Sequence, residues 1–130
     1  MNDTYDAWLT IFADHQVATV LWTWYAVPAE EGCVCSGEQV IFRDGRRVPL
    51  SEIAAQELYE TIWEISAETR DDLDICAYLG VFRLDVATRT VCKIADVGNW
   101  EDADYDWELN PGYTPSIDPL PADQQPCCTI

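Results

Sequence analysis

A row of alternating carboxylates is the most distinctive candidate binding feature of this sequence. Between residues 99 and 109 the chain reads Asn-Trp-Glu-Asp-Ala-Asp-Tyr-Asp-Trp-Glu-Leu. In an extended strand successive side chains point to opposite faces, so this stretch has one apolar face and one acidic face. No lysine or arginine follows Lys93, so nothing later in the sequence neutralises the row. The acidic face comprises Asp102, Asp104, Asp106 and Glu108.

The spacing of these carboxylates is similar to that of nucleic-acid phosphates. Alternate residues of a strand lie about 6.6 Å apart, and phosphates along one nucleic-acid strand follow each other at a path distance of about 6–7 Å. The row can therefore imitate phosphates toward a protein that binds nucleic acid through Lys and Arg. Trp100 would either anchor the partner, because Trp is preferred at protein interfaces, or hold the acidic strand on the core. Glu101 is a second-rank candidate for partner binding. By period, Tyr105 and Trp107 face the core.

A second acidic surface is expected on a helix. Residues 52–68 follow Ser51, a good N-cap, and carry apolar residues at helical spacing. Glutamates recur at every third or fourth position of this segment, where like charges repel, and the segment contains no lysine. Acidic residues continue after it. The second-rank candidates for partner binding are Glu57, Glu60, Glu64, Asp71, Asp72 and Asp74.

The charge balance indicates the kind of partner. The chain has 130 residues, enough for one domain with a core, with 24 acidic and 7 basic side chains and a net charge of −17. Direct binding to nucleic acid or to an anionic membrane is disfavoured, and a basic protein partner is favoured. The alternative is an acidic surface that only keeps the protein soluble. Segregation of the acids from the bases, and aromatic residues among the acids, favour an interaction surface.

The N-terminal residues, the apolar runs and the cysteines indicate the cellular compartment. The first residues lack the basic and apolar regions of a signal peptide, and the longest apolar run is too short to cross a membrane. We therefore expect a cytoplasmic protein with its six cysteines mostly reduced.

Metal and catalytic motifs are incomplete. Asp102-x-Asp104-x-Asp106 matches the opening of an EF-hand loop, but Trp107 stands where the loop needs Gly and Tyr113 where it needs Glu. The cysteines lack the repeated pairs typical of zinc sites. No catalytic motif is present, and the only histidine, His15, lies at the C-terminal end of the expected first helix. We expect no metal, no cofactor and no enzymatic activity, with a metal-binding acidic domain as an alternative.

The order of periodic segments predicts the fold class. Helices are expected at residues 4–15 and 52–68, and strands at residues 17–27, 34–43, 77–86 and 90–97, with a tight turn at 44–45 and a short return at 46–49. Residues 1–110 form a single α+β domain: an antiparallel sheet of four to five strands with two helices on one face, in the order α-β-β-α-β-β. Residues 111–130 form a Pro-rich tail. The inward face of the first helix should carry Ala7, Trp8, Ile11 and Phe12.

The predicted second hairpin resembles a known family. Residues 80–91, Gly-Val-Phe-Arg-Leu-Asp-Val-Ala-Thr-Arg-Thr-Val, and the acidic aromatic segment after them are similar to an uncharacterised family of small acidic proteins carried on bacterial mobile elements. The similarity covers about a quarter of the chain, and residues 28–37, with two cysteines, replace the Gly/Asp-rich loop of that family. The family has no established activity. The resemblance implies a mobile-element gene, where inhibitors of host defence are common.

These features predict an inhibitor of a bacterial defence system, either anti-CRISPR or anti-restriction. It would bind the basic nucleic-acid site of its target as an acidic mimic. The first alternative is an immunity protein or antitoxin that neutralises a basic nuclease toxin, since the charge argument is the same. Arg43, Arg46 and Arg47 form a small basic cluster. Pairing of this cluster with the acids of a second copy makes a homodimer a further alternative.

Overall fold

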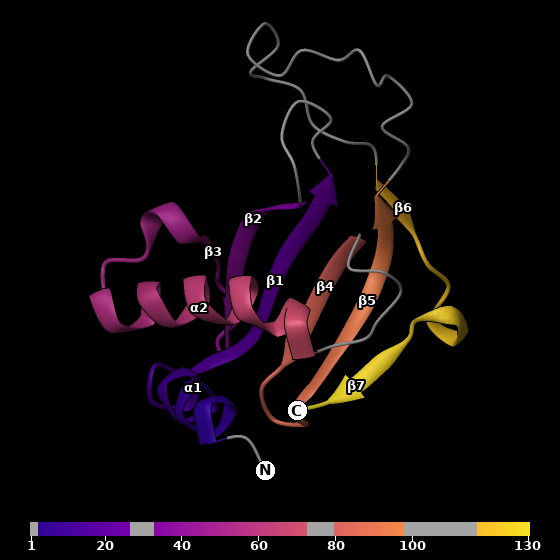
Figure 1. Cartoon of the computed structure of the whole chain (residues 1–130). Helices are drawn as coiled ribbons and strands as arrows, with labels where there is room; N and C mark the ends of the chain where they lie inside the picture. The colour runs from indigo at the N-terminus through magenta and orange to yellow at the C-terminus, as the bar shows by residue number, and fades with distance from the viewer. Residues whose placement is uncertain (1–2, 27–32, 73–79, 98–116) are drawn as a thin grey trace, which may run out of the picture.

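The computed structural model describes residues 3–26, 33–72, 80–97 and 117–130. The strands form one antiparallel sheet in the order β3-β2-β1-β4-β5-β6, and β7 pairs with the end of β5 that β6 leaves uncovered (Figure 1). In chain order the elements are α1 (Asp3–Asp14), β1 (Val17–Ala26), β2 (Cys33–Phe42), β3 (Arg47–Pro49), η1 (Leu50–Glu52), α2 (Gln56–Asp72), β4 (Gly80–Asp85), β5 (Thr90–Val97), β6 (Ile117–Pro119), η3 (Ala122–Gln124) and β7 (Cys127–Thr129).

The central strand β1 organises the buried face of the sheet. Val20 stands opposite Val40 of β2 and Leu84 of β4, and Trp22 stands opposite Phe82. The Trp22 and Phe82 rings stack with centroids 6.0 Å apart. All five side chains are buried, as alternation along a strand with one covered face requires.

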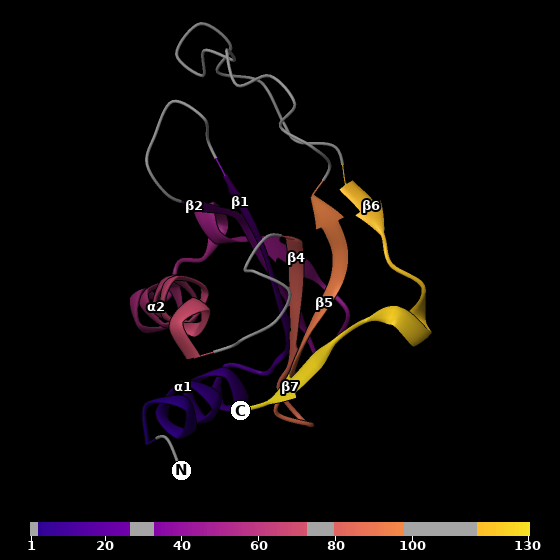
Figure 2. The same cartoon turned by 45° about the vertical axis from the view of Figure 1, so that its right-hand side comes forward.

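Both helices lie on the same side of the sheet (Figure 2). Their buried side chains join those of β1, β2, β4 and β5 in one hydrophobic cluster. Burial of this apolar surface is the main stabilising contribution to the fold. The helical members of the cluster are Tyr5, Trp8, Leu9 and Phe12 from α1 and Leu58, Ile62 and Ile65 from α2.

A bulge between β4 and β5 places the only lysine of the sequence inside the protein. Val81 pairs with Ala95 and Phe82 with Lys93, so β5 has one extra residue at this point. The Lys93 side chain is 7% exposed, and its Nζ lies 2.7 Å from Oδ1 of Asp96. A Cβ at Gly80 would lie 2.6 Å from Cε of Lys93 and from the Ala95 carbonyl oxygen. Lys93 is thus enclosed and paired, and contributes little to any basic surface.

The α+β class, the antiparallel sheet and the two helices are confirmed. The predicted strand number and order are wrong. The short return predicted at residues 46–49 forms β3, but two further three-residue strands, β6 and β7, also join the sheet. The last two belong to residues 111–130, which the sequence assigned to a Pro-rich tail, and both pair with β5. None of the described helices is both long and apolar enough to cross a membrane.

Two details of the helices also differ from the prediction. Ser51 does not cap α2, since it lies within η1 and the chain is extended at Ile53 before the helix begins. In α1, Ala7 is exposed and Ile11 is only half-buried, while Tyr5 and Leu9 are buried. The buried stripe of α1 is therefore rotated toward Tyr5 and Leu9, which leaves Ala7 and Ile11 facing α2.

Candidate partner-binding site

A groove with a volume of ≈ 500 Å³ runs between α1 and α2. Each wall is one ridge of a helix, with residues spaced by three or four positions. The α1 wall carries no charge, whereas the α2 wall carries three carboxylates. The lining residues are Thr4, Ala7, Trp8 and Ile11 from α1 and Glu57, Glu60, Thr61 and Glu64 from α2.

Neutral hydrogen-bond donors orient two of these carboxylates. Nε1 of Trp8 donates to Oε2 of Glu64 at 2.9 Å, and Nε2 of Gln56 donates to Oε1 of Glu60 at 2.9 Å. These bonds hold the carboxylates without neutralising them. We call Glu57, Glu60 and Glu64 the acidic ridge. Its third member, Glu57, has its Oε2 3.6 Å from Nε2 of His15.

Four described basic side chains form ion pairs with aspartates away from Glu60 and Glu64. Arg46, Arg83, Arg89 and Lys93 pair respectively with Asp44, Asp85, Asp6 and Asp96. Among the side chains that the structure describes, neither Glu60 nor Glu64 has an ion pair. The groove therefore presents a net negative charge, which attracts a cationic partner.

Trp63 lies beside the acidic ridge and was not among the sequence candidates. Its side chain is 53% exposed, and it is the one large hydrophobic residue left exposed in the described part of the chain. It directly precedes Glu64 and follows Glu60 by three positions, so the three share the outer surface of α2. One sequence feature indicates that Trp63 is exposed. It directly follows Ile62 and therefore lies about 100° around the helix from the stripe of buried residues on α2.

None of the other predicted site residues is among the described residues that line the groove. Asp71 and Asp72 end α2, and their side chains lie outside the description. The first-rank candidates occupy the connection between Val97 and Ile117, which pair across β5 and β6. Their role stays a prediction. The candidates outside the described residues are Asp74, Trp100, Glu101, Asp102, Asp104, Asp106 and Glu108.

The predicted basic cluster occupies the hairpin between β2 and β3. Its three arginines are exposed.

Asp44 accepts hydrogen bonds from the backbone N–H of Arg46 at 3.0 Å and from its Nε at 2.7 Å. The backbone bond, followed by the guanidinium, lowers the pKa of Asp44. Arg46 also lies 4.7 Å above the Phe42 ring, and Arg43 donates to Gln16. Contacts within the chain thus occupy much of this cluster, which weakens the case for a homodimer.

Two of the cysteines, Cys92 and Cys127, form a disulfide. Cys92 is buried, as expected for an apolar strand, but its sulfur is bonded to Cys127. The expectation of reduced cysteines does not hold for this pair. Among the described residues, no group of three or more His, Cys, Asp or Glu side chains is placed to hold a metal ion.

Comparison with known proteins gave no match: no family model, curated protein or solved structure is similar to this chain. What the protein does is therefore inferred from the chemistry of the groove and of α2.

Proposed function

We propose that this chain inhibits a bacterial defence system, of the anti-CRISPR or anti-restriction kind, by occupying the basic nucleic-acid site of a partner protein. The observation that carries the proposal is the acidic ridge of α2. Glu60 and Glu64 are oriented by neutral donors, lack ion pairs within the described residues, and lie beside the exposed Trp63. An unneutralised ridge of this kind is complementary to a surface built from Lys and Arg.

The spacing of the acidic ridge suits a phosphate mimic. With a rise of about 1.5 Å per residue, Glu60 lies about 4.5 Å along the axis from Glu57 and about 6 Å from Glu64. Successive phosphates of one nucleic-acid strand are separated by a path of about 6–7 Å. Arginines that grip a phosphate backbone can therefore meet these carboxylates instead, with bidentate hydrogen bonds available at each.

Trp63 gives such a surface an apolar anchor. A partially exposed indole can stack on an arginine guanidinium or enter a pocket of the partner. Charge alone gives fast but weakly specific association, whereas a buried aromatic side chain contributes affinity at the centre of an interface. The combination of Trp63 with the acidic ridge thus fits a protein partner better than a dissolved cation.

The proposed mechanism is steric exclusion. The inhibitor covers the nucleic-acid site and needs no catalytic group, metal or cofactor of its own. The acidic stretch from Asp102 to Glu108, which lies outside the described residues, is proposed as a second partner-binding segment. The alternative of an immunity protein uses the same chemistry and differs in the partner, a nuclease toxin.

A phage-challenge assay tests the proposal. Bacterial strains that each carry one CRISPR or restriction system are infected with and without expression of the chain. We expect plaque formation to be restored in at least one strain, and to be lost again with Glu60→Lys/Glu64→Lys. Asp123→Lys, an exposed acid on η3, is the control and should retain inhibition. If no system is inhibited and a neighbouring nuclease toxin is neutralised instead, the immunity-protein alternative replaces the proposal.

A second pair of charge reversals separates the two acidic surfaces. Asp104→Lys/Asp106→Lys reverses the same number of charges in the stretch that the sequence ranks first. Loss of inhibition with both pairs would indicate one extended interface. Loss with the α2 pair alone would restrict the interface to the groove.

A further inference from the structure

The strand β7 covers part of β5 at the edge of the sheet. Thr129 pairs with Thr90, Cys128 with Val91 and Cys127 with Cys92. β6 pairs with the other end of β5, from Ala95↔Pro119 to Val97↔Ile117. In both views β7 runs beside the lower half of β5, with η3 between it and β6 (Figures 1 and 2).

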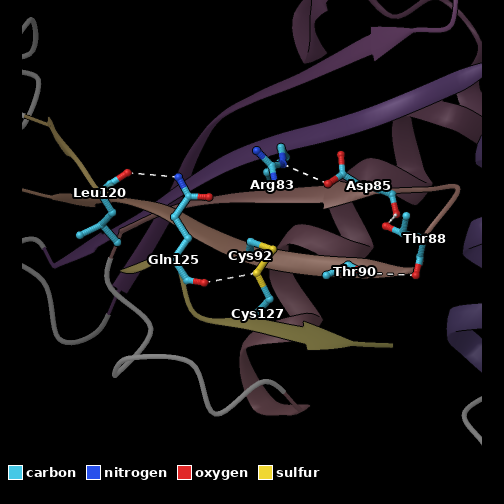
Figure 3. The surroundings of a disulfide bond; sticks show 8 residues. All are labelled: Arg83, Asp85, Thr88, Thr90, Cys92, Leu120, Gln125 and Cys127. Carbon is cyan, nitrogen blue, oxygen red and sulfur yellow. Dashed lines mark hydrogen bonds and ion pairs between the residues drawn. A yellow bond between two sulfur atoms is a disulfide. The ribbon is translucent and has the colours of Figure 1, made fainter. Parts of the chain in front are cut away.

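A disulfide bond fastens β7 to β5. Cys92 and Cys127 stand directly opposite each other in the pairing, with Cα atoms 4.1 Å apart, and their sulfurs are bonded (Figure 3). Cys92 is 3% exposed, whereas Cys127 is an exposed residue. The two residues that the bond joins therefore differ in their exposure to solvent.

Few other interactions hold β7. Besides the three residue pairs, the Ile130 N–H donates to the Arg89 carbonyl at 2.8 Å, and Nε of Arg89 donates to the Ile130 carbonyl at 2.9 Å. The Lys93 N–H donates to the Pro126 carbonyl at 3.0 Å. Cys128 and Ile130 are only partly buried against the core. Short elements with few buried contacts open readily, so the covalent bond is the dominant restraint on β7.

The neighbouring Cys128 takes no part in the bond. Successive residues of a strand face opposite sides of the sheet, so its thiol points away from the Cys92–Cys127 bond. It is free and packs partly against the hydrophobic cluster. Cys128 therefore provides a matched control within the same strand.

We propose that Cys127 is a site of thiol–disulfide exchange with a small thiol of the glutathione class, and that this exchange releases β7 from β5. Attack proceeds in line with the breaking bond, so it requires access to the outer side of the attacked sulfur. Because Cys127 is an exposed residue and Cys92 is buried, we expect the attack at Cys127.

The exchange proceeds in two steps, in which atoms, electrons and protons balance. The thiolate forms a bond to Sγ of Cys127, the bond between the two cysteines breaks, and Sγ of Cys92 leaves as a thiolate that takes up a proton. A second thiol then attacks the mixed disulfide. The products are two protein thiols and the oxidised small-molecule disulfide, so two electrons pass from the small thiols to the protein. In a reducing compartment β7 is released, and in an oxidising one it is fastened.

Peptide-resolved alkylation and hydrogen exchange test this. The purified chain is incubated in glutathione buffers from fully oxidised to fully reduced, free thiols are alkylated, and peptides are analysed by mass spectrometry. We expect the glutathione adduct on Cys127, a free thiol on Cys92, and amide exchange at Lys93 and Ile130 accelerated by about tenfold or more on reduction. An adduct formed first on Cys92, or both cysteines free in the oxidised buffer, would overturn the proposal.

Two variants separate release of β7 from general unfolding. Cys127→Ser removes the bond at an exposed position, and should give fast exchange at Lys93 and Ile130 in every buffer while amides of β1 and β4 stay protected. Cys128→Ala should keep the bond and the slow exchange in the oxidised buffer. If β7 amides stay protected in Cys127→Ser, the disulfide does not control β7 and the proposal is refuted.

Discussion

Trp8 and Glu64 join the two helices across the groove: Nε1 of Trp8 donates a hydrogen bond to Oε2 of Glu64 at 2.9 Å. Trp8 is 4% exposed and belongs to the hydrophobic core. The bond therefore ties a surface carboxylate to the interior. A carboxylate that is already held in place loses less conformational freedom when a cationic group binds to it.

Replacing Trp8 with Phe should lower the free energy of unfolding by about 1–2 kcal/mol, because a buried aromatic contact is reduced and a hydrogen bond to a charged group is lost. Glu64→Gln is the matched change, since its amide oxygen can still accept the bond, and should cost less. Urea denaturation of both variants measures the difference. Equal stability of Trp8→Phe and the unchanged protein would contradict this role of Trp8.

Gly80 should tolerate no side chain. Its φ is +145°, and a Cβ would come within 2.6 Å of both the Ala95 oxygen and Cε of Lys93. Gly45 is a matched control, because its φ is +92° but nothing lies within 4 Å of a Cβ there. Gly45→Ala should cost about 1–2 kcal/mol for the backbone conformation alone. Gly80→Ala should cost about 1–3 kcal/mol more, from overpacking. Similar losses in thermal unfolding for the two variants would show that Lys93 and β5 move aside freely.

The Asp44 turn predicts a pH effect. Hydrogen bonds from the Arg46 backbone and guanidinium lower the pKa of Asp44, so the bonds stabilise the folded state when the carboxyl is ionised. This contribution is present above the ordinary pKa of Asp, about 3.9, and is lost as the pH falls through the lower folded-state pKa. Carbon-detected NMR titration should place the Asp44 midpoint below the ordinary value. In Arg46→Gln the midpoint should rise but stay depressed, since the backbone bond remains. A midpoint at or above the ordinary value would exclude this arrangement.

Much of the fold is readable from sequence periodicity. The β-branched and aromatic residues of 17–27 predict the strand β1, and Asp44-Gly45 predicts the tight turn between β2 and β3. β6 and β7 are not predictable in this way, because three residues next to prolines carry no period. The Cys92–Cys127 bond is equally hidden, since spacing along the chain does not determine disulfide connectivity.

The candidate site is readable only in part. The spacing of Glu57, Glu60 and Glu64 places them on one ridge, and they line one wall of the groove. The opposite wall is a product of tertiary packing, because Ala7 and Ile11 fit a buried stripe equally well until α1 docks on the sheet. The exposure of Trp63 has the same origin. Its hydrophobicity suits the core, but the rotation of α2 that buries Ile62 and Ile65 turns it outward.

The most direct measurement of the central claim is a competition experiment on the target identified by phage challenge. Labelled nucleic acid is bound to the target, and the chain is added at low and at moderate salt. We predict displacement of the nucleic acid, with an apparent affinity that falls steeply as salt rises. Glu60→Lys/Glu64→Lys should weaken displacement by more than about tenfold, and Asp123→Lys should leave it unchanged. Simultaneous binding of chain and nucleic acid, or displacement insensitive to salt and to the double charge reversal, would contradict the account.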